Sequence, residues 1–311
     1  MSERVGGGPL GVAIPRVSVR RQALALLELT KPRIAMLVVM TGVPALLLAA
    51  HGFPDARVFW GTLIGTVLAA SSAASFNMYF DRDIDALMRR TARRPLPAGV
   101  LPPASALALG FALAAAAWWV LASTSNLLAA AIGLVSIFYY AIVYTVWLKR
   151  RTAQNIVIGG GAGASAPLIA WAAVTGHLSW AAVMLAGIIF LWTPPHFWAL
   201  SLFRREDYER AGVPMLPVVR GEAETRVQIL LYTLVLVPVT IAAAPVVALG
   251  RLYVVSAAVL GALFLWGAVR VLRQSAPNAP MRLFHFSIIY LFLLYLMMTA
   301  DALIGAIQRA A

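Results

Sequence analysis

The sequence contains no cysteine among its 311 residues. This absence excludes disulfide bridges, thiolate metal sites and cysteine nucleophiles. Charged residues are also scarce, at 12% of the chain, whereas hydrophobic residues make up 61% and the mean hydropathy is +0.84. A soluble globular protein of this length could not bury so much apolar surface. The composition therefore predicts a membrane protein with several transmembrane helices.

Lysine is nearly absent as well. Lys31 and Lys149 are the only lysines among 25 basic residues, so the formal net charge of +13 comes almost wholly from arginine. In a soluble protein, a pI near 11.0 would suggest a nucleic-acid partner. In a membrane protein the same excess is explained by topology and by contact with the lipid bilayer, so we expect no nucleic acid.

Nine apolar stretches are long enough to cross a bilayer. They lie at about 34–51, 58–80, 102–122, 126–148, 154–175, 179–201, 228–248, 251–271 and 284–307. If the N-terminus is cytosolic, 22 of the 25 basic residues fall on the cytosolic side, and only Arg57, Arg251 and Arg309 fall outside. The sequence therefore predicts an all-α bundle of nine transmembrane helices around a central cavity that opens to the cytosol, with a periplasmic C-terminus.

The first 26 residues differ in composition from the rest. They contain no apolar core typical of a secretory signal, and Gly6–Gly8, Pro9 and Pro15 disfavour a helix. We expect residues 1–26 to form a disordered cytosolic tail before a membrane domain over residues 27–311.

The second apolar stretch ends in a regular series of polar residues. Asn77, Asp81 and Asp85 are spaced four apart, so a continuing helix would place them on one face about one turn apart, with Asp83 on another face. Oxygen ligands in this pattern suit Mg²⁺ bound to a polyphosphate. The alternative is a charged helix end in which Asp81 and Asp85 pair with arginines nearby.

Two basic segments accompany this series. The first segment contains Arg89, Arg90, Arg93 and Arg94, followed by Pro95 and Pro97, which stiffen the loop. Its guanidinium groups are candidates for binding phosphate oxygens; the alternative is that they serve only as a topology signal. The loop after the sixth stretch combines arginines with acids, and Asp207 is its candidate for a second metal or phosphate position.

Aromatic and histidine residues mark a second candidate region. Thr193-Pro194-Pro195 is expected to break the sixth helix and to leave carbonyl groups unpaired, which must line something polar. His196 follows directly and is a candidate substrate contact, unless it only caps those carbonyls. Tyr144 belongs either to the interfacial aromatic belt or to a π-rich wall around a carbocation.

The same residues resemble a known family, the UbiA-type membrane prenyltransferases, and within it the branch of the heme O synthases. The resemblance covers roughly residues 27–307. Its motifs are Leu29-Thr30-Lys31-Pro32-Arg33, Asn77-xxx-Asp81-xxx-Asp85, Met88–Pro97, Pro195-His196-Phe197-Trp198-Ala199-Leu200 and Asp207–Pro217. Many members carry a second Asp-xxx-Asp pair after the sixth helix. Here Arg204 and Tyr208 take those flanking positions, which leaves open whether one or two Mg²⁺ ions bind.

The resemblance implies transfer of a farnesyl group from farnesyl diphosphate to a vinyl group of haem B, with Mg²⁺ as cofactor, in the bacterial inner membrane. It implies metal ligands at Asn77, Asp81 and Asp85, with Arg94 and Asp207 as further catalytic residues. The implied substrate-binding residues are Lys31, Arg90, Arg93, Arg94, Arg205, Tyr208, His196 and Tyr144. His196 would ligate the haem iron, bond a propionate or assist the final step. A downstream haem A synthase is a candidate partner.

Two other functions remain open at this stage. One is a UbiA-type transferase with another aromatic or quinone-precursor acceptor. The other, from a different class, is an ion-coupled transporter that uses Asp81 and Asp85 as ion sites. The position of both carboxylates at a helix end rather than at the bilayer midplane argues against the transporter.

Overall fold

The computed structural model describes residues 18–310 of the chain, and each regular element in that part is a helix. In chain order these are α1 (Val19–Leu29), α2 (Pro32–Ala49), α3 (Ala56–Leu87), α4 (Pro103–Thr124), α5 (Leu127–Phe138), the π-helix η1 (Tyr139–Leu148), α6 (Asn155–Gly163), α7 (Ser165–Thr175), α8 (Trp180–Phe203), α9 (Arg205–Arg210), α10 (Leu216–Val219), α11 (Gly221–Val246), α12 (Arg251–Leu272) and α13 (Ala279–Ala310). Nine segments within residues 18–310 are long and apolar enough to cross a membrane, which confirms the predicted number.

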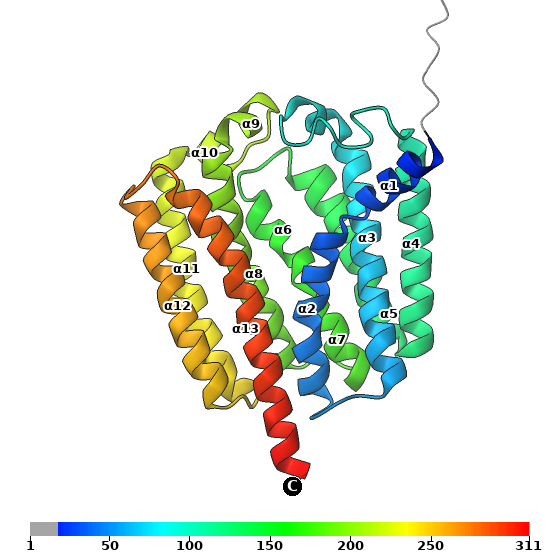
Figure 1. The fold of residues 1–311 in the computed structure, drawn as a ribbon, viewed down its shortest axis with the longest axis vertical. Helices are drawn as coiled ribbons and strands as arrows, with labels where there is room; N and C mark the ends of the chain where they lie inside the picture. The colour runs from blue at the N-terminus through cyan, green and yellow to red at the C-terminus, as the bar shows by residue number, and fades with distance from the viewer. Residues whose placement is uncertain (1–17, 311) are drawn as a thin grey trace, which may run out of the picture.

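The start of the described chain corrects one prediction. Of the tail expected over residues 1–26, residues 1–17 lie outside the described residues, but residues 19–26 are helical in α1. The helix begins because the Ser18 hydroxyl accepts a hydrogen bond from the backbone N–H of Arg21, which caps the first turn. α1 lies across the upper ends of α3 and α4 in Figure 1.

Several helices extend beyond the apolar stretches that predicted them. α3 continues to Leu87 instead of ending near residue 80, and α11 begins at Gly221 instead of near 228. Polar residues can continue a helix past the membrane boundary because the backbone hydrogen bonds of the helix stay satisfied. The extension of α3 matters most, because it keeps Asp81 and Asp85 in helical register.

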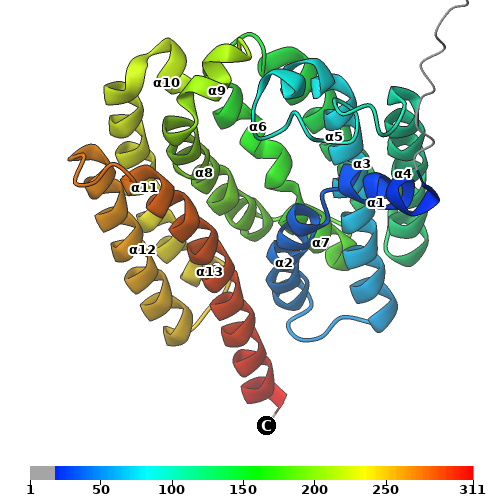
Figure 2. The same cartoon turned by 45° about the horizontal axis from the view of Figure 1, so that its top comes forward.

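The long helices form two groups on either side of α2. α3, α4, α5 and α7 lie on one side, and α8, α11, α12 and α13 lie on the other (Figures 1 and 2). Small residues allow the closest approaches. A methyl group added at Gly65 of α3 would lie 2.5 Å from Leu121 of α4, so only glycine permits this contact.

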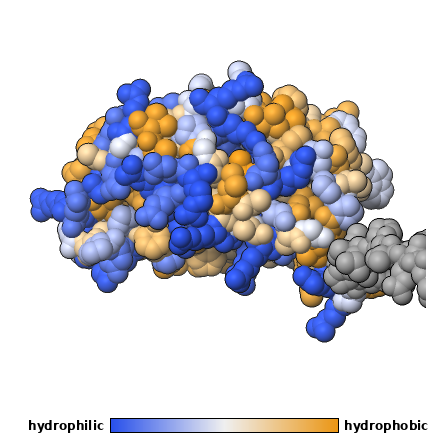
Figure 3. Space-filling view, turned by 90° about the horizontal axis from the view of Figure 1, so that it is seen from above, coloured by the Kyte–Doolittle hydropathy of each residue, from blue (hydrophilic) through white to orange (hydrophobic). Residues whose placement is uncertain are grey.

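One end of the bundle is polar. α9, α10 and the loop between α3 and α4 lie together at the top of Figure 1, and hydrophilic residues gather across this end when it is seen from above (Figure 3). The C-terminal end of α13 lies at the opposite end of the bundle. The two acidic and arginine-rich segments of the sequence therefore meet at a single face.

The fourth membrane-crossing segment is not a uniform α-helix. After α5, residues Tyr139–Leu148 form a π-helix, and the N–H of Lys149 donates to the carbonyl of Tyr144, five residues earlier, at 2.8 Å. π-helical turns are rare and occur often at functional sites. Here the wider turn carries Tyr140, Tyr144 and Thr145 toward the polar end of the bundle.

The basic residues predict an orientation that reporter fusions can test. A reporter fused after Arg94 or Arg220 should read cytosolic, and one fused after Gly176 or Arg309 should read periplasmic, because 22 of the 25 basic residues would then face the cytosol. A periplasmic signal after Arg94 would contradict both the orientation and the order of the helices.

Candidate active site

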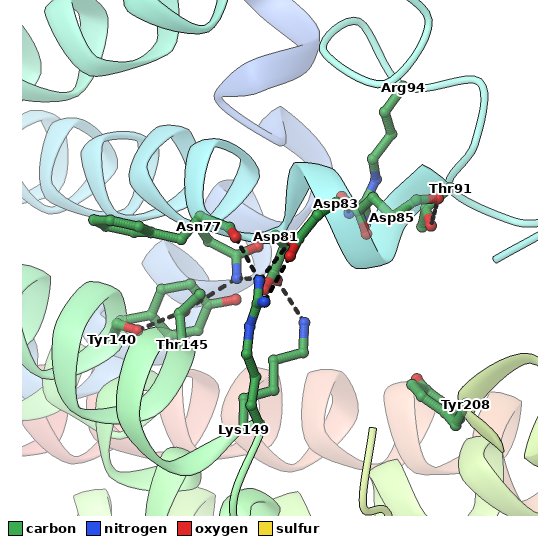
Figure 4. A network of polar contacts seen from close by, with 12 residues as sticks. Asn77, Asp81, Asp83, Asp85, Thr91, Arg94, Tyr140, Thr145, Lys149 and Tyr208 are labelled. Carbon is green, nitrogen blue, oxygen red and sulfur yellow. Dashed lines mark hydrogen bonds and ion pairs between the residues drawn. The ribbon is translucent and has the colours of Figure 1, made fainter. Parts of the chain in front are cut away.

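Asn77, Asp81 and Asp85 share one buried face of α3, as their spacing predicts (Figure 4). Their exposed fractions are 3%, 0% and 1%. Asn77 Nδ2 donates to Asp81 Oδ2 at 2.7 Å and to the hydroxyl of Thr145 in η1 at 3.1 Å. The shared face is therefore confirmed, whereas the metal-binding role of these residues stays a prediction.

Asp83 lies on another face of α3, as the same spacing predicts. Its carboxylate is exposed and forms a two-pronged ion pair with the guanidinium of Arg150, with both N···O distances at 2.7 Å. The hydrogen bond with Asp83 raises the pKa of Arg150. Arg150 also donates to the carbonyl of Phe80, so this pair ties α3 to the end of η1 at the surface.

Both lysines of the chain lie at the buried face. Lys149 Nζ is 2.5 Å from Asp81 Oδ2, and Lys31 Nζ donates to Asn77 Oδ1 at 2.7 Å. Lys31 adopts a left-handed backbone conformation with φ 47°, which is uncommon for a residue other than glycine and often marks functional sites. The sequence argument used Lys149 only as a topology marker and missed this contact. The rarity of lysine was the signal that could have identified it.

The arginine loop closes over the end of α3. Arg94 Nη1 lies 2.6 Å from Asp85 Oδ2, and the Thr91 hydroxyl donates to the Asp85 carbonyl at 2.9 Å. Arg90 donates to the Tyr208 hydroxyl at 3.4 Å, so the loop reaches α9. Burial raises the pKa of Tyr208, which keeps its phenol protonated at neutral pH. Arg93, by contrast, is exposed.

Asp207 and Arg205 belong to a different environment. Asp207 is buried and lies 3.7 Å from Arg210, while Arg205 lies 3.5 Å from Glu222. Both line a polar cavity of about 460 Å³ with Arg89. Among the contacts of residues 18–310, none joins Asp207 to Asp81 or Asp85. The proposed role of Asp207 in a second metal or phosphate position is untested.

The predicted break before His196 does not occur. α8 runs through Pro194 and Pro195 without interruption, and the Thr193 hydroxyl donates to the Ile189 carbonyl. Two prolines remove only their own N–H donors, and packing against neighbouring helices retains the helical path. His196 therefore lies inside a helix instead of a loop. Its ring stacks on Trp192, with centroids 4.2 Å apart, and not on the adjacent Phe197 and Trp198.

An apolar cavity of about 410 Å³ lies between α2, η1, α6, α8 and α13. Its lining includes Arg90, Tyr140, Tyr144, His196 and Phe284. Tyr140 and Tyr144 have ring centroids 5.3 Å apart, and a methyl group added at Gly159 would lie 2.3 Å from the ring of Tyr144. The cavity therefore joins aromatic walls to the arginine loop at its polar end.

The buried face suits a divalent cation that brings further ligands with it. Asp81 Oδ1 is buried without a hydrogen-bond partner among residues 18–310, so one carboxylate oxygen is left for a cation. Within that part of the chain, no three histidine or acidic side chains lie close enough together to hold a metal ion by themselves. A donor set of two carboxylates and an amide fits Mg²⁺, which commonly takes one or two carboxylates plus substrate phosphates.

These features define a multi-pass helical membrane protein with a buried cluster of acid, amide and lysine groups beside an aromatic cavity. The chain belongs to the UbiA prenyltransferase family, whose model matches residues 36–296.

Relatives with assigned names cover nearly the whole chain. A protoheme IX farnesyltransferase from Symbiobacterium thermophilum is 51% identical over 275 residues, which is 88% of this chain and 92% of that protein. One from Gloeobacter violaceus is 50% identical over 277 residues, which is 89% of this chain and 91% of that protein.

Solved structures share the fold at much lower identity. A structure described as digeranylgeranylglyceryl phosphate synthase has a TM-score of 0.75 at 17% identity and covers 91% of this chain and 99% of its own. A UbiA homologue from Archaeoglobus fulgidus bound to DMAPP and Mg²⁺ has a TM-score of 0.65 at 15% identity, covering 89% and 98%. At these identities the likeness shows the fold.

Proposed function

We propose that the protein transfers a farnesyl group from farnesyl diphosphate to a vinyl group of haem B and so produces haem O. The observation that carries this proposal is identity near 50%, over about nine-tenths of both chains, to proteins named protoheme IX farnesyltransferase. The buried acidic face of α3, the arginine loop and the aromatic cavity supply the groups that this reaction needs.

The polar end of the site would bind the diphosphate. Lys31, Lys149 and Arg94 each contact a residue of the buried face, so three basic side chains would lie near the place where negative charge develops on the leaving group. Asn77, Asp81 and Asp85 would hold Mg²⁺, which neutralises the diphosphate and lowers the barrier to C–O cleavage. Charges fixed in advance of the reaction need no reorganisation as the bond breaks.

The aromatic walls would protect the allylic cation. When the C–O bond breaks, the diphosphate leaves with the electron pair and the farnesyl carbon becomes positively charged. Tyr140 and Tyr144 line the cavity, and their ring faces stabilise a cation while the apolar lining excludes water. The vinyl carbon then forms the new C–C bond. Water adds to the second cation beside the macrocycle, releases a proton and leaves a hydroxyl group.

The location and partners of the reaction follow from this proposal. The polar end would face the cytosol of a bacterial inner membrane, with the C-terminus in the periplasm, because this orientation satisfies the distribution of basic residues. A haem A synthase that consumes the product is the expected protein partner.

A direct assay tests the function. Purified protein in detergent should convert labelled farnesyl diphosphate and haem B into a labelled haem when Mg²⁺ is present, and chelation of the metal should stop the conversion. A parallel incubation with a quinone precursor distinguishes the acceptors. Label in the quinone precursor and none in haem would contradict the proposal.

A further inference from the structure

We propose that His196 binds the iron of the acceptor haem through Nε2, and that Ser287 is the positioning residue that sets the required tautomer. The inference rests on the proposed function, because it takes haem as the molecule that enters the cavity. It adds a specific atom, a protonation state and a residue of α13 that no sequence motif indicated.

The tautomer follows from two short contacts. His196 Nδ1 lies 2.6 Å from the Ser287 hydroxyl oxygen, and that oxygen lies 2.6 Å from the carbonyl oxygen of Phe284. Both distances require a proton between the atoms. The hydroxyl has a single proton and the carbonyl has none, so the hydroxyl donates to Phe284. The proton of the first contact must therefore come from His196, which makes Nδ1 the protonated nitrogen.

The second ring nitrogen then carries a free lone pair. In the neutral imidazole only one nitrogen is protonated, so Nε2 is an acceptor. The hydrogen bonds of residues 18–310 engage His196 through Nδ1 and not through Nε2, and His196 lines the 410 Å³ cavity. A haem offers a Lewis-acidic iron to such a lone pair, and neutral imidazole is a common axial ligand of haem iron.

The ring is also fixed in orientation. It stacks between Trp192 and Phe284, with centroid distances of 4.2 and 4.7 Å and interplanar angles of 16° and 24°. Trp192 Nε1 donates to the backbone carbonyl of Ser287 at 2.8 Å, so Ser287 holds both the histidine and one of its stacking partners. Metal-binding histidines commonly donate their other N–H to a second protein group in this way, and that bond sets the tautomer.

Haem binding can be measured without turnover. Ferric haem titrated into the wild-type protein should give the absorption spectrum of imidazole-ligated iron. His196→Ala should lose this spectrum, and added imidazole should restore it by entering the vacated space. Ser287→Ala removes the hydroxyl but retains the backbone bond to Trp192. It should weaken haem binding by about 10-fold or more, as loss of a group that orients a metal ligand commonly does.

The matched control is His285→Ala. His285 lies on the same helix, two residues from Ser287, but is exposed and does not line the cavity, so its removal should leave the haem spectrum unchanged. Affinity for farnesyl diphosphate, measured separately, should stay near the wild-type value in all three variants. If His196→Ala does not fold, His196→Gln and Ser287→Ala decide the question.

The results separate this inference from the function on which it rests. An unchanged haem spectrum in the His196 variants, or full haem affinity in Ser287→Ala, would overturn the iron contact even if the wild type farnesylates haem. Loss of the spectrum in His196→Ala, from a wild type that binds haem but transfers no farnesyl group to it, would support the contact and contradict the function.

Discussion

Replacing Asp81 or Asp85 by asparagine is expected to lower farnesyl transfer by at least about 100-fold. Each change removes a carboxylate that would hold the Mg²⁺ ion, and this ion would neutralise the leaving diphosphate. Asparagine is the sharper test than alanine. Asp81 and Asp85 are buried and paired with Lys149 and Arg94, and asparagine retains both the size of the side chain and an acceptor oxygen for these donors, whereas alanine would leave a cavity and no acceptor. The rate should be measured at saturating farnesyl diphosphate and haem.

Asp83→Asn is the matched control for this experiment. Asp83 lies on the same turn of α3, but its side chain is exposed and pairs with Arg150 at the surface. Loss of this pair should change stability by less than about 1 kcal/mol and activity by no more than a few-fold. A loss of activity at Asp83 equal to that at Asp81 would contradict the assignment of the reaction to the buried face.

Lys149→Met is expected to lower kcat/KM for farnesyl diphosphate by roughly 100-fold, because it removes a buried positive charge from the place where the diphosphate would bind. Methionine is similar in length and unbranched, so the space is filled while the charge is lost. The Nζ atom lies 2.5 Å from Asp81 Oδ2, beside the residues proposed to hold Mg²⁺. Steady-state kinetics with varied farnesyl diphosphate measures the effect.

The adjacent residue provides the comparison. Arg150→Gln also removes one positive charge from the end of η1, but within residues 18–310 the hydrogen bonds of Arg150 go to Asp83 and to the Phe80 carbonyl, and not to Asp81. We expect a change of a few-fold at most. Equal effects of the two substitutions would mean that net charge at this end of the bundle matters, and not the position of Lys149.

The sequence allows much of this arrangement to be predicted because its strongest patterns are local. Apolar stretches identify the nine segments of the described chain, residues 18–310, that are long and apolar enough to cross a bilayer, since a bilayer demands a minimum helix length. The four-residue spacing of Asn77, Asp81 and Asp85 places them on one face once the helix continues, which depends only on helical geometry. Their roles in binding metal and substrate stay predictions.

The missed features depend on contacts between distant segments. Lys149 reaches Asp81 across 68 positions of sequence, and Ser287 reaches His196 across 91, so no local spacing reveals either pair. The prolines before His196 led to the prediction of a helix break that the structure does not contain. A helix packed among other helices tolerates the loss of two N–H donors, and α8 therefore continues where its sequence alone indicated a break.

The π-helix of residues Tyr139–Leu148 gives this span a local reserve of chain length. The N–H of Lys149 bonds to the carbonyl of Tyr144, five residues earlier. Removing one residue between them would turn this bond into the four-residue bond of an α-helix, so Lys149 would keep its backbone partner and its contact with Asp81. The same deletion in α5 would turn each later residue by about 100° and would move Lys149 away from Asp81. A single deletion should therefore be better tolerated in the π-helix than in the α-helix that precedes it.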